Sequence, residues 1–91
     1  MTNLALTDFA EGAVYQVAAA DGVHELTLET ASELPSSIRA EGSFRLAFRG
    51  PFEPILEQAI YPFRNGEFAS EIFIVPIARD ASGTLYEAIF N

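Results

Sequence analysis

The chain contains no cysteine, no lysine and no tryptophan. Without cysteine, disulfide bridges, zinc–thiolate sites and thiol nucleophiles are excluded, so the folded state must be stabilised by burial of apolar side chains. Without lysine, Schiff-base chemistry and a phosphate-binding loop of the usual type are excluded as well.

Positive charge is scarce, because five arginines stand against thirteen acidic residues and give a formal net charge of −8. Nucleic acids and anionic membrane surfaces both require clustered cations, so neither is expected as a partner. The longest wholly apolar run, residues 72–78, is too short to span a bilayer as a helix. Residues 1–6 have neither the basic region nor the apolar stretch of a secretory signal peptide. We therefore expect a cytoplasmic protein, or one exported only as part of an assembly.

The length of the chain predicts a single all-β domain, residues 1–91, with one core. Hydrophobic residues make up 49% of the chain, which is high for a small domain with an unfavourable surface-to-volume ratio. Either the core is dense in phenylalanine, or some apolar surface faces a second chain or a ligand.

Alternation of apolar and polar side chains predicts about six β-strands. The expected strands cover residues 13–20, 23–30, 43–49, 59–63, 72–77 and 85–90. Turn signals lie at Asp21-Gly22, Asn65-Gly66 and Asp80 to Gly83, and a surface loop is expected at residues 32–42. Residues 6–12 should form one helical turn with Phe9 packed over one end of the sheet. The predicted fold is an all-β, small antiparallel barrel or roll of about six strands in meander order, with one short N-terminal helical turn.

The second and third expected strands match each other in charge. Glu25 and Glu29 have the same spacing as Arg45 and Arg49. An antiparallel register would therefore place Glu29 opposite Arg45 and Glu25 opposite Arg49, and cross-strand pairs of opposite charge favour such a register.

The C-terminal hairpin is apolar on both faces, since residues 72–77 present no polar side chain on either side. A strand that is apolar on both faces is typically a central strand, buried on both sides. Pro76 within this segment is instead expected at an edge strand or a bulge. A turn joining Arg79 to Thr84 would pair Val75 with Ala88. Because a small barrel has only one interior, we expect the outer face of this hairpin to contact a protein partner or a second copy of the chain. The candidate interface residues are Ile72, Ile74, Pro76, Leu85 and Ile89.

Residues able to support catalysis or metal binding form no recognisable constellation. His24 is the only histidine, and one imidazole without a serine elbow predicts neither a general-base site nor a zinc site. Acids four residues apart, such as Glu53 and Glu57, more often form a solvated face than a glycosidase or calcium site. The loop beginning at Asp80 lacks the later oxygen ligands of a calcium loop. No catalytic residue, cofactor or metal is therefore expected.

Eight phenylalanines and three tyrosines leave a second interpretation open. These rings either fill a narrow barrel or line a cavity in which an arginine, such as Arg49 or Arg79, orients an anionic small molecule. Filling is the more common arrangement. The leading hypothesis is therefore a non-enzymatic structural or protein-interaction module in a homo-oligomer or larger assembly, and the less favoured alternative is a small-ligand-binding β-barrel.

Four segments in the second half of the chain carry a family resemblance. They are Phe48-Arg49-Gly50-Pro51, Ile60-Tyr61, Phe73 to Ile77 followed by Arg79-Asp80 and Gly83, and the ending Tyr86 to Asn91. Together they resemble a family of short bacterial all-β domains of unknown function, and the ending is the most specific part. The resemblance implies an antiparallel fold. Through a loose association with phage-tail-like or tail-collar proteins, it also implies a structural or assembly role, and it implies no catalytic residue.

Overall fold

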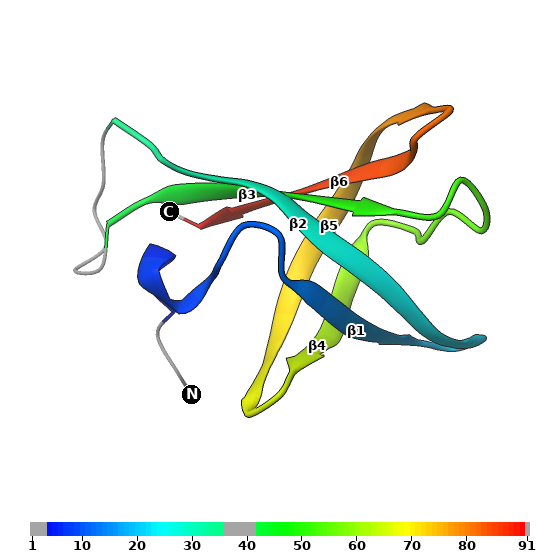
Figure 1. Ribbon diagram of the computed structural model, residues 1–91, viewed down its shortest axis with the longest axis horizontal. Coiled ribbons are helices and arrows are strands. Elements are labelled where there is room, and N and C mark those ends of the chain that lie inside the picture. The colour runs from blue at the N-terminus through cyan, green and yellow to red at the C-terminus, as the bar shows by residue number, and fades with distance from the viewer. Residues whose placement is uncertain (1–3, 36–41, 91) are drawn as a thin grey trace.

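A computed structural model describes residues 4–35 and 42–90. Six antiparallel strands close into one barrel, and a short 3₁₀ turn precedes the first strand (Figure 1). The elements are η1 (Leu6–Asp8), β1 (Val14–Ala19), β2 (Gly22–Glu33), β3 (Phe44–Gly50), β4 (Ala59–Asn65), β5 (Phe68–Asp80) and β6 (Gly83–Phe90). The predicted fold class is confirmed. The predicted loop at residues 32–42 begins later than expected, since β2 runs to Glu33, and residues 36–41 lie outside the described part of the chain.

The strand order around the barrel is β1-β2-β3-β6-β5-β4, and β4 pairs with β1, so the predicted meander order is wrong. The barrel consists instead of two three-stranded meanders, and residues 51–58 carry the chain between them. Prolines 51 and 54 cannot donate to a ladder, so this segment cannot return as a strand beside β3. β6 occupies that place and pairs with β3 from Phe44 to Gly50. Strands β1 to β4 thereby form a Greek key, with the fourth strand beside the first.

Strands β2 and β3 are neighbours as predicted, but the predicted register between them is wrong. Leu28 pairs with Phe48, and a bulge between Leu28 and Thr30 shifts the rest of the ladder. Arg49 lies opposite Thr27 and Arg45 opposite Ser32, so the ladder differs from the prediction by two residues on one side of the bulge and by three on the other. The bulge accounts for only one residue of this difference, so the spacing of the charges did not identify the partners.

The β5–β6 hairpin also contains a bulge, between Pro76 and Ala78. Pro76 is confirmed at a bulge, one of the positions in a sheet where proline is tolerated. The extra residue shifts the register by one, so Val75 pairs with Glu87 and the predicted pairing with Ala88 is wrong.

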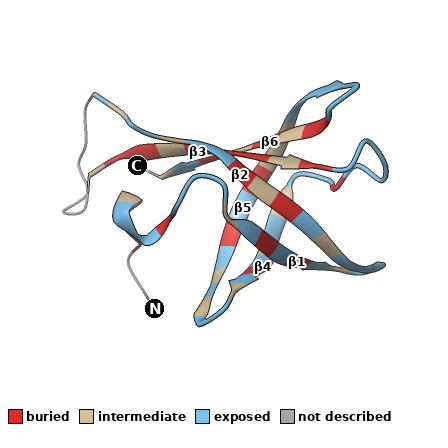
Figure 2. Ribbon diagram, in the orientation of Figure 1, coloured by how far each residue is buried: buried red, intermediate tan, exposed pale blue. Residues whose placement is uncertain are grey.

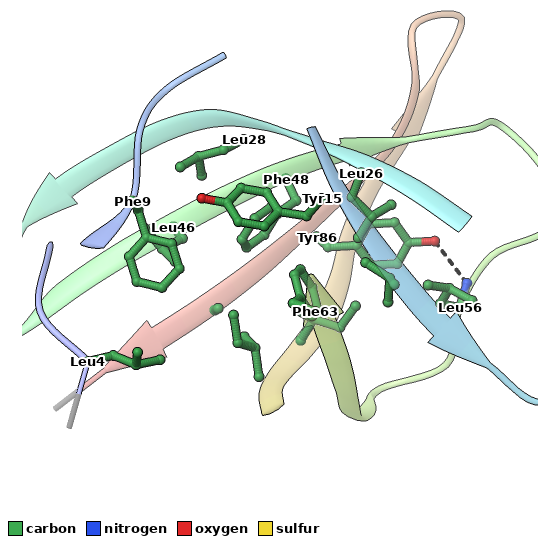
Figure 3. Close-up of a cluster of buried hydrophobic side chains, with 14 of the residues drawn as sticks. Leu4, Phe9, Tyr15, Leu26, Leu28, Leu46, Phe48, Leu56, Phe63 and Tyr86 are labelled. Carbon is green, nitrogen blue, oxygen red and sulfur yellow. Dashed lines mark hydrogen bonds between the residues drawn. The ribbon is translucent and has the colours of Figure 1, made fainter. Parts of the chain in front are cut away.

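Every strand contributes buried residues (Figure 2), and their apolar side chains fill the interior (Figure 3). The rings of Phe48 and Phe63 are 5.0 Å apart between centroids, and those of Tyr15 and Phe48 are 5.7 Å apart. The residues exposed to 2% or less include Tyr15, Val17, Leu26, Leu28, Phe44, Leu46, Phe48, Phe63, Ile72, Ile74 and Tyr86. These contacts favour a filled interior over a ligand cavity.

Two buried anchors close the ends of the barrel. The backbone N–H of Leu56, in the crossing segment, donates a hydrogen bond of 2.8 Å to the buried hydroxyl of Tyr86 (Figure 3). At the other anchor Phe9, just after η1, packs against Phe68 of β5 and Phe90 of β6, with ring centroids 5.4 and 6.1 Å away. The predicted packing of Phe9 over one end of the sheet is confirmed. Within residues 4–35 and 42–90, no helix has the length and apolarity needed to cross a membrane.

Candidate interaction surface

The five predicted interface residues lie on different sides of the barrel wall. Ile72 and Ile74 are exposed to 1% and 0% and point into the core, so their assignment to an outer surface is corrected. Pro76 is half-buried beside the bulge. On β6, Leu85 is half-buried and Ile89 is 44% exposed. Docking of a partner at Leu85 and Ile89 stays a prediction.

The outer face of β4 and β5 carries an apolar surface that includes none of the five predicted interface residues. Ile60 of β4 lies directly opposite Phe73 of β5, and their side chains are 61% and 47% exposed. Val75 is half-buried and Ile77 is 44% exposed, and both follow Phe73 along β5. We call Ile60, Phe73, Val75 and Ile77 the β4–β5 apolar face.

A sequence signal for this orientation exists at Glu71. Alternate residues of a strand share a face, so Glu71 and Phe73 point the same way. Burial of an unpaired carboxylate is costly, so Glu71 marks the outer side and places Phe73 there as well. The neighbouring Ile72 must then point inward, as it does in the structure.

The predicted charge pairs between β2 and β3 form with other partners. The Arg49 guanidinium donates to Glu29 at 2.8 Å, and not to Glu25. Arg45 bonds Glu87 of β6 instead of Glu29. These pairs are partly exposed, so each contributes only a few tenths of a kcal/mol to about 1 kcal/mol. The guanidinium groups of Arg45 and Arg49 are thus both bound to carboxylates on the outside of the barrel.

Arg79 binds residues of the crossing segment, residues 51–58. Its guanidinium lies 3.6 Å from the centroid of the Phe52 ring and donates to the Phe52 carbonyl at 3.0 Å and to Glu53 at 3.2 Å. An open depression of about 540 Å³ beside it is lined by Glu53, Pro54, Ile55 and Arg79. Because Glu53 already neutralises the guanidinium, the depression offers no excess positive charge for an anion. Arg49 and Arg79, the two arginines named for the ligand-binding alternative, both bond carboxylates on the outside of the barrel.

Acidic groups lie on more than one side of the β4–β5 apolar face. Burial raises the pKa of Tyr61, and the charges of Glu57 and Asp21 raise it further. The Tyr61 hydroxyl donates to the Glu57 carbonyl at 2.7 Å. Three segments, namely the β1–β2 turn, the crossing segment and β5 through Glu71, thus bring carboxylates towards the strand that carries Ile60.

The remaining candidate groups have local structural partners. One ring nitrogen of His24, Nε2, lies 2.8 Å from Asp21 Oδ1, and this hydrogen bond lowers the pKa of Asp21. The Asp80 carboxylate accepts the N–H of Ser82 at 2.8 Å within the β5–β6 turn, a common turn contact. In the described part of the chain, no group of three histidine, cysteine, aspartate or glutamate residues is placed to hold a metal ion.

Comparison with protein families identifies one relationship. A sequence model of the family described as "Domain of unknown function (DUF6916)" matches residues 4–90, a span that contains all six strands. Comparisons with curated proteins and with solved structures found no match.

Proposed function

The chain belongs to the family of unknown function whose model spans residues 4–90, and because that family's description assigns no activity, we propose a function from the barrel surface. The protein acts as a non-enzymatic interaction module that docks a protein partner through the β4–β5 apolar face. It works as a structural component of an assembly. A specific place in a phage-tail-like assembly stays a hypothesis from the resemblance.

The observation that carries this proposal is the exposed pair of Ile60 and Phe73. Single exposed apolar residues are common on soluble proteins and need no explanation. Here two large side chains lie directly opposite each other, and Val75 and Ile77 extend the same surface along β5. Contiguous exposed apolar surface is typical of protein–protein contacts.

The filled core supports the same conclusion. Tyr15, Phe48 and Phe63 are in ring contact inside the barrel, and their hydrophobic area contributes to folding. Ile60 and Phe73 contribute less to folding, because their side chains are 61% and 47% exposed. A surface that contributes less to folding is freer to serve binding.

The proposal is tested by replacing the face while measuring stability. The double variant Ile60→Ser, Phe73→Ser should keep its free energy of unfolding within about 1 kcal/mol of the wild type, since surface substitutions typically change it by about 0.5 kcal/mol each. It should also lose the wild type's retention on a hydrophobic-interaction column and its enhancement of bis-ANS fluorescence.

Val23→Ser is the matched control, because Val23 is 67% exposed but lies on β2, which does not pair with β4 or β5. It should change retention and dye binding far less than the double variant. A loss of several kcal/mol in the double variant would show that these side chains hold the fold together. Equal retention of wild type and double variant would show that no working apolar surface exists there.

A further inference from the structure

We propose that the β4–β5 apolar face docks a protein partner whose own apolar side chains are bordered by lysine or arginine, and not a second copy of this chain. The inference rests on the proposed docking function and adds the chemistry of the partner. It is carried by the distribution of charge around Ile60 and Phe73.

The border of the face is acidic. Glu71 shares the outer side of β5 with Phe73 and is exposed, and Glu57 precedes β4, two residues before Ala59. Within the described part of the chain, neither carboxylate has an arginine within ion-pair distance. The carboxylates of Glu57 and Glu71 are therefore available to cations of a partner. Asp21 adds negative charge near Tyr61, the neighbour of Ile60 in β4.

The chain's own cations do little to offset these acids. Arg45, Arg49 and Arg79 are bonded to carboxylates of the same chain. Of the described arginines, only Arg64 has no carboxylate partner, and it lies diagonally across the β4–β5 ladder from Glu71, where it offsets part of the acidic border at that end. The whole chain carries a formal net charge of −8. The face thus lies in a negative field.

A second copy fits this face poorly. A two-fold symmetric contact uses the same surface on both copies, so each face would dock against a surface with the same acidic border and no added cations. Two chains of like net charge also repel each other at long range. A partner with a basic border removes both costs and is attracted to the face before contact.

Two synthetic peptides test the proposal. One alternates lysine with valine and the other alternates glutamate with valine, so that both present the same apolar side chains with opposite charge. Each is titrated into the full-length ¹⁵N-labelled protein, and amide shifts report the site and the affinity. The lysine peptide should shift residues of β4 and β5 around Ile60 and Phe73. It should bind at least about fivefold more tightly than the glutamate peptide at low salt, with the advantage shrinking as salt screens the charges.

Variants separate the apolar and the charged contributions. Phe73→Ser should weaken the lysine peptide about tenfold, the usual effect of removing an aromatic anchor. Glu71→Gln should weaken it about two- to threefold and reduce its salt dependence, because an exposed ion pair contributes little. Glu33→Gln is the matched control and should change neither, because Glu33 is exposed on β2, away from β4 and β5.

The outcomes distinguish the two proposals. Equal binding of both peptides at the Phe73 face would overturn the basic partner and leave the docking function standing. A wild-type dimer that grows with added salt and is lost in Phe73→Ser would also overturn it, because a second copy would then be the occupant. Lysine-peptide shifts confined to residues away from β4 and β5, or no binding at millimolar peptide, would overturn the basic partner and remove this support for the docking function.

Discussion

Replacing Gly83 by alanine should destabilise the barrel far more than an ordinary turn substitution. Gly83 begins β6 with a φ of 119°, a conformation that side-chain-bearing residues rarely adopt. A Cβ built on Gly83 would lie 2.0 Å from the backbone oxygen of Gly50, at the end of β3. A backbone oxygen cannot rotate out of the way as a side chain can, so the two strands would have to separate at this point.

The magnitude follows from two contributions. The backbone strain of a non-glycine residue at this φ costs about 1–2 kcal/mol. Separating the ends of β3 and β6 loses one or two ladder hydrogen bonds, at about 1 kcal/mol each. We therefore expect Gly83→Ala to lose about 2–4 kcal/mol, a large part of the roughly 5–15 kcal/mol that stabilises a typical domain.

Gly22→Ala is the matched control for the strain alone. Gly22 has a φ of 133°, and no atom lies within 4 Å of the position that a Cβ would occupy there. It should lose about 1–2 kcal/mol. Urea denaturation followed by far-UV circular dichroism measures both variants. If Gly83→Ala is no more destabilised than Gly22→Ala, the close approach of the two strands does not constrain residue 83 and the reasoning is refuted.

Two further predictions concern single polar contacts. Tyr86→Phe should lower the free energy of unfolding, measured by urea denaturation, by about 1–3 kcal/mol, because the N–H of Leu56 would be left buried without its acceptor. The Tyr61 hydroxyl bonds an exposed carbonyl, so Tyr61→Phe should lower it by less than about 1 kcal/mol. Equal losses in the two variants would contradict the role of burial. The pKa of Asp21 is lowered, chiefly by its hydrogen bond with His24, so its carboxylate stabilises the fold above the unfolded pKa of about 3.9 and that contribution is lost as the pH falls through the lower folded pKa. ¹³C-detected titration of the carboxyl carbon should show the lowered pKa, and His24→Gln should raise it; an unchanged value would contradict the assignment.

The strands could be predicted because alternation is local, whereas their order could not. Whether β4 or β6 lies beside β3 depends on residues far apart in the chain. The prolines of the crossing segment exclude continuation of β3, but they do not say where the chain returns. The register of β5 and β6 failed on the Pro76 side of the bulge for a similar reason, since the bulge there adds a residue that neither strand reveals by itself. The β2–β3 register failed because opposite charges alone do not fix which residues pair.

The candidate surface was predicted on the β5–β6 hairpin, whereas the proposed face lies on β4 and β5, and Ile72 and Ile74 of the predicted set point inward. Residues 72–77 are apolar on both sides, so their own pattern is uninformative about which side is inward. Glu71 and Glu87 carry that information, because each occupies the outer side of its strand beside Phe73 or Ile89. The exposed position of Ile60 depends on its pairing with β5, which only the three-dimensional structure supplies.

The crossing segment sets the route by which this barrel can assemble. Val17 pairs with Phe63 across the β1–β4 seam and Phe44 pairs with Phe90 across the β3–β6 seam, and each pair is 46 positions apart in the chain. Neither seam can form until a long loop has been closed, and both must form before the rings from the two meanders share one core. Folding should therefore be slow for a chain of this size, in the range of milliseconds to seconds. Until both seams have closed, each meander exposes strand edges that invite pairing with other chains.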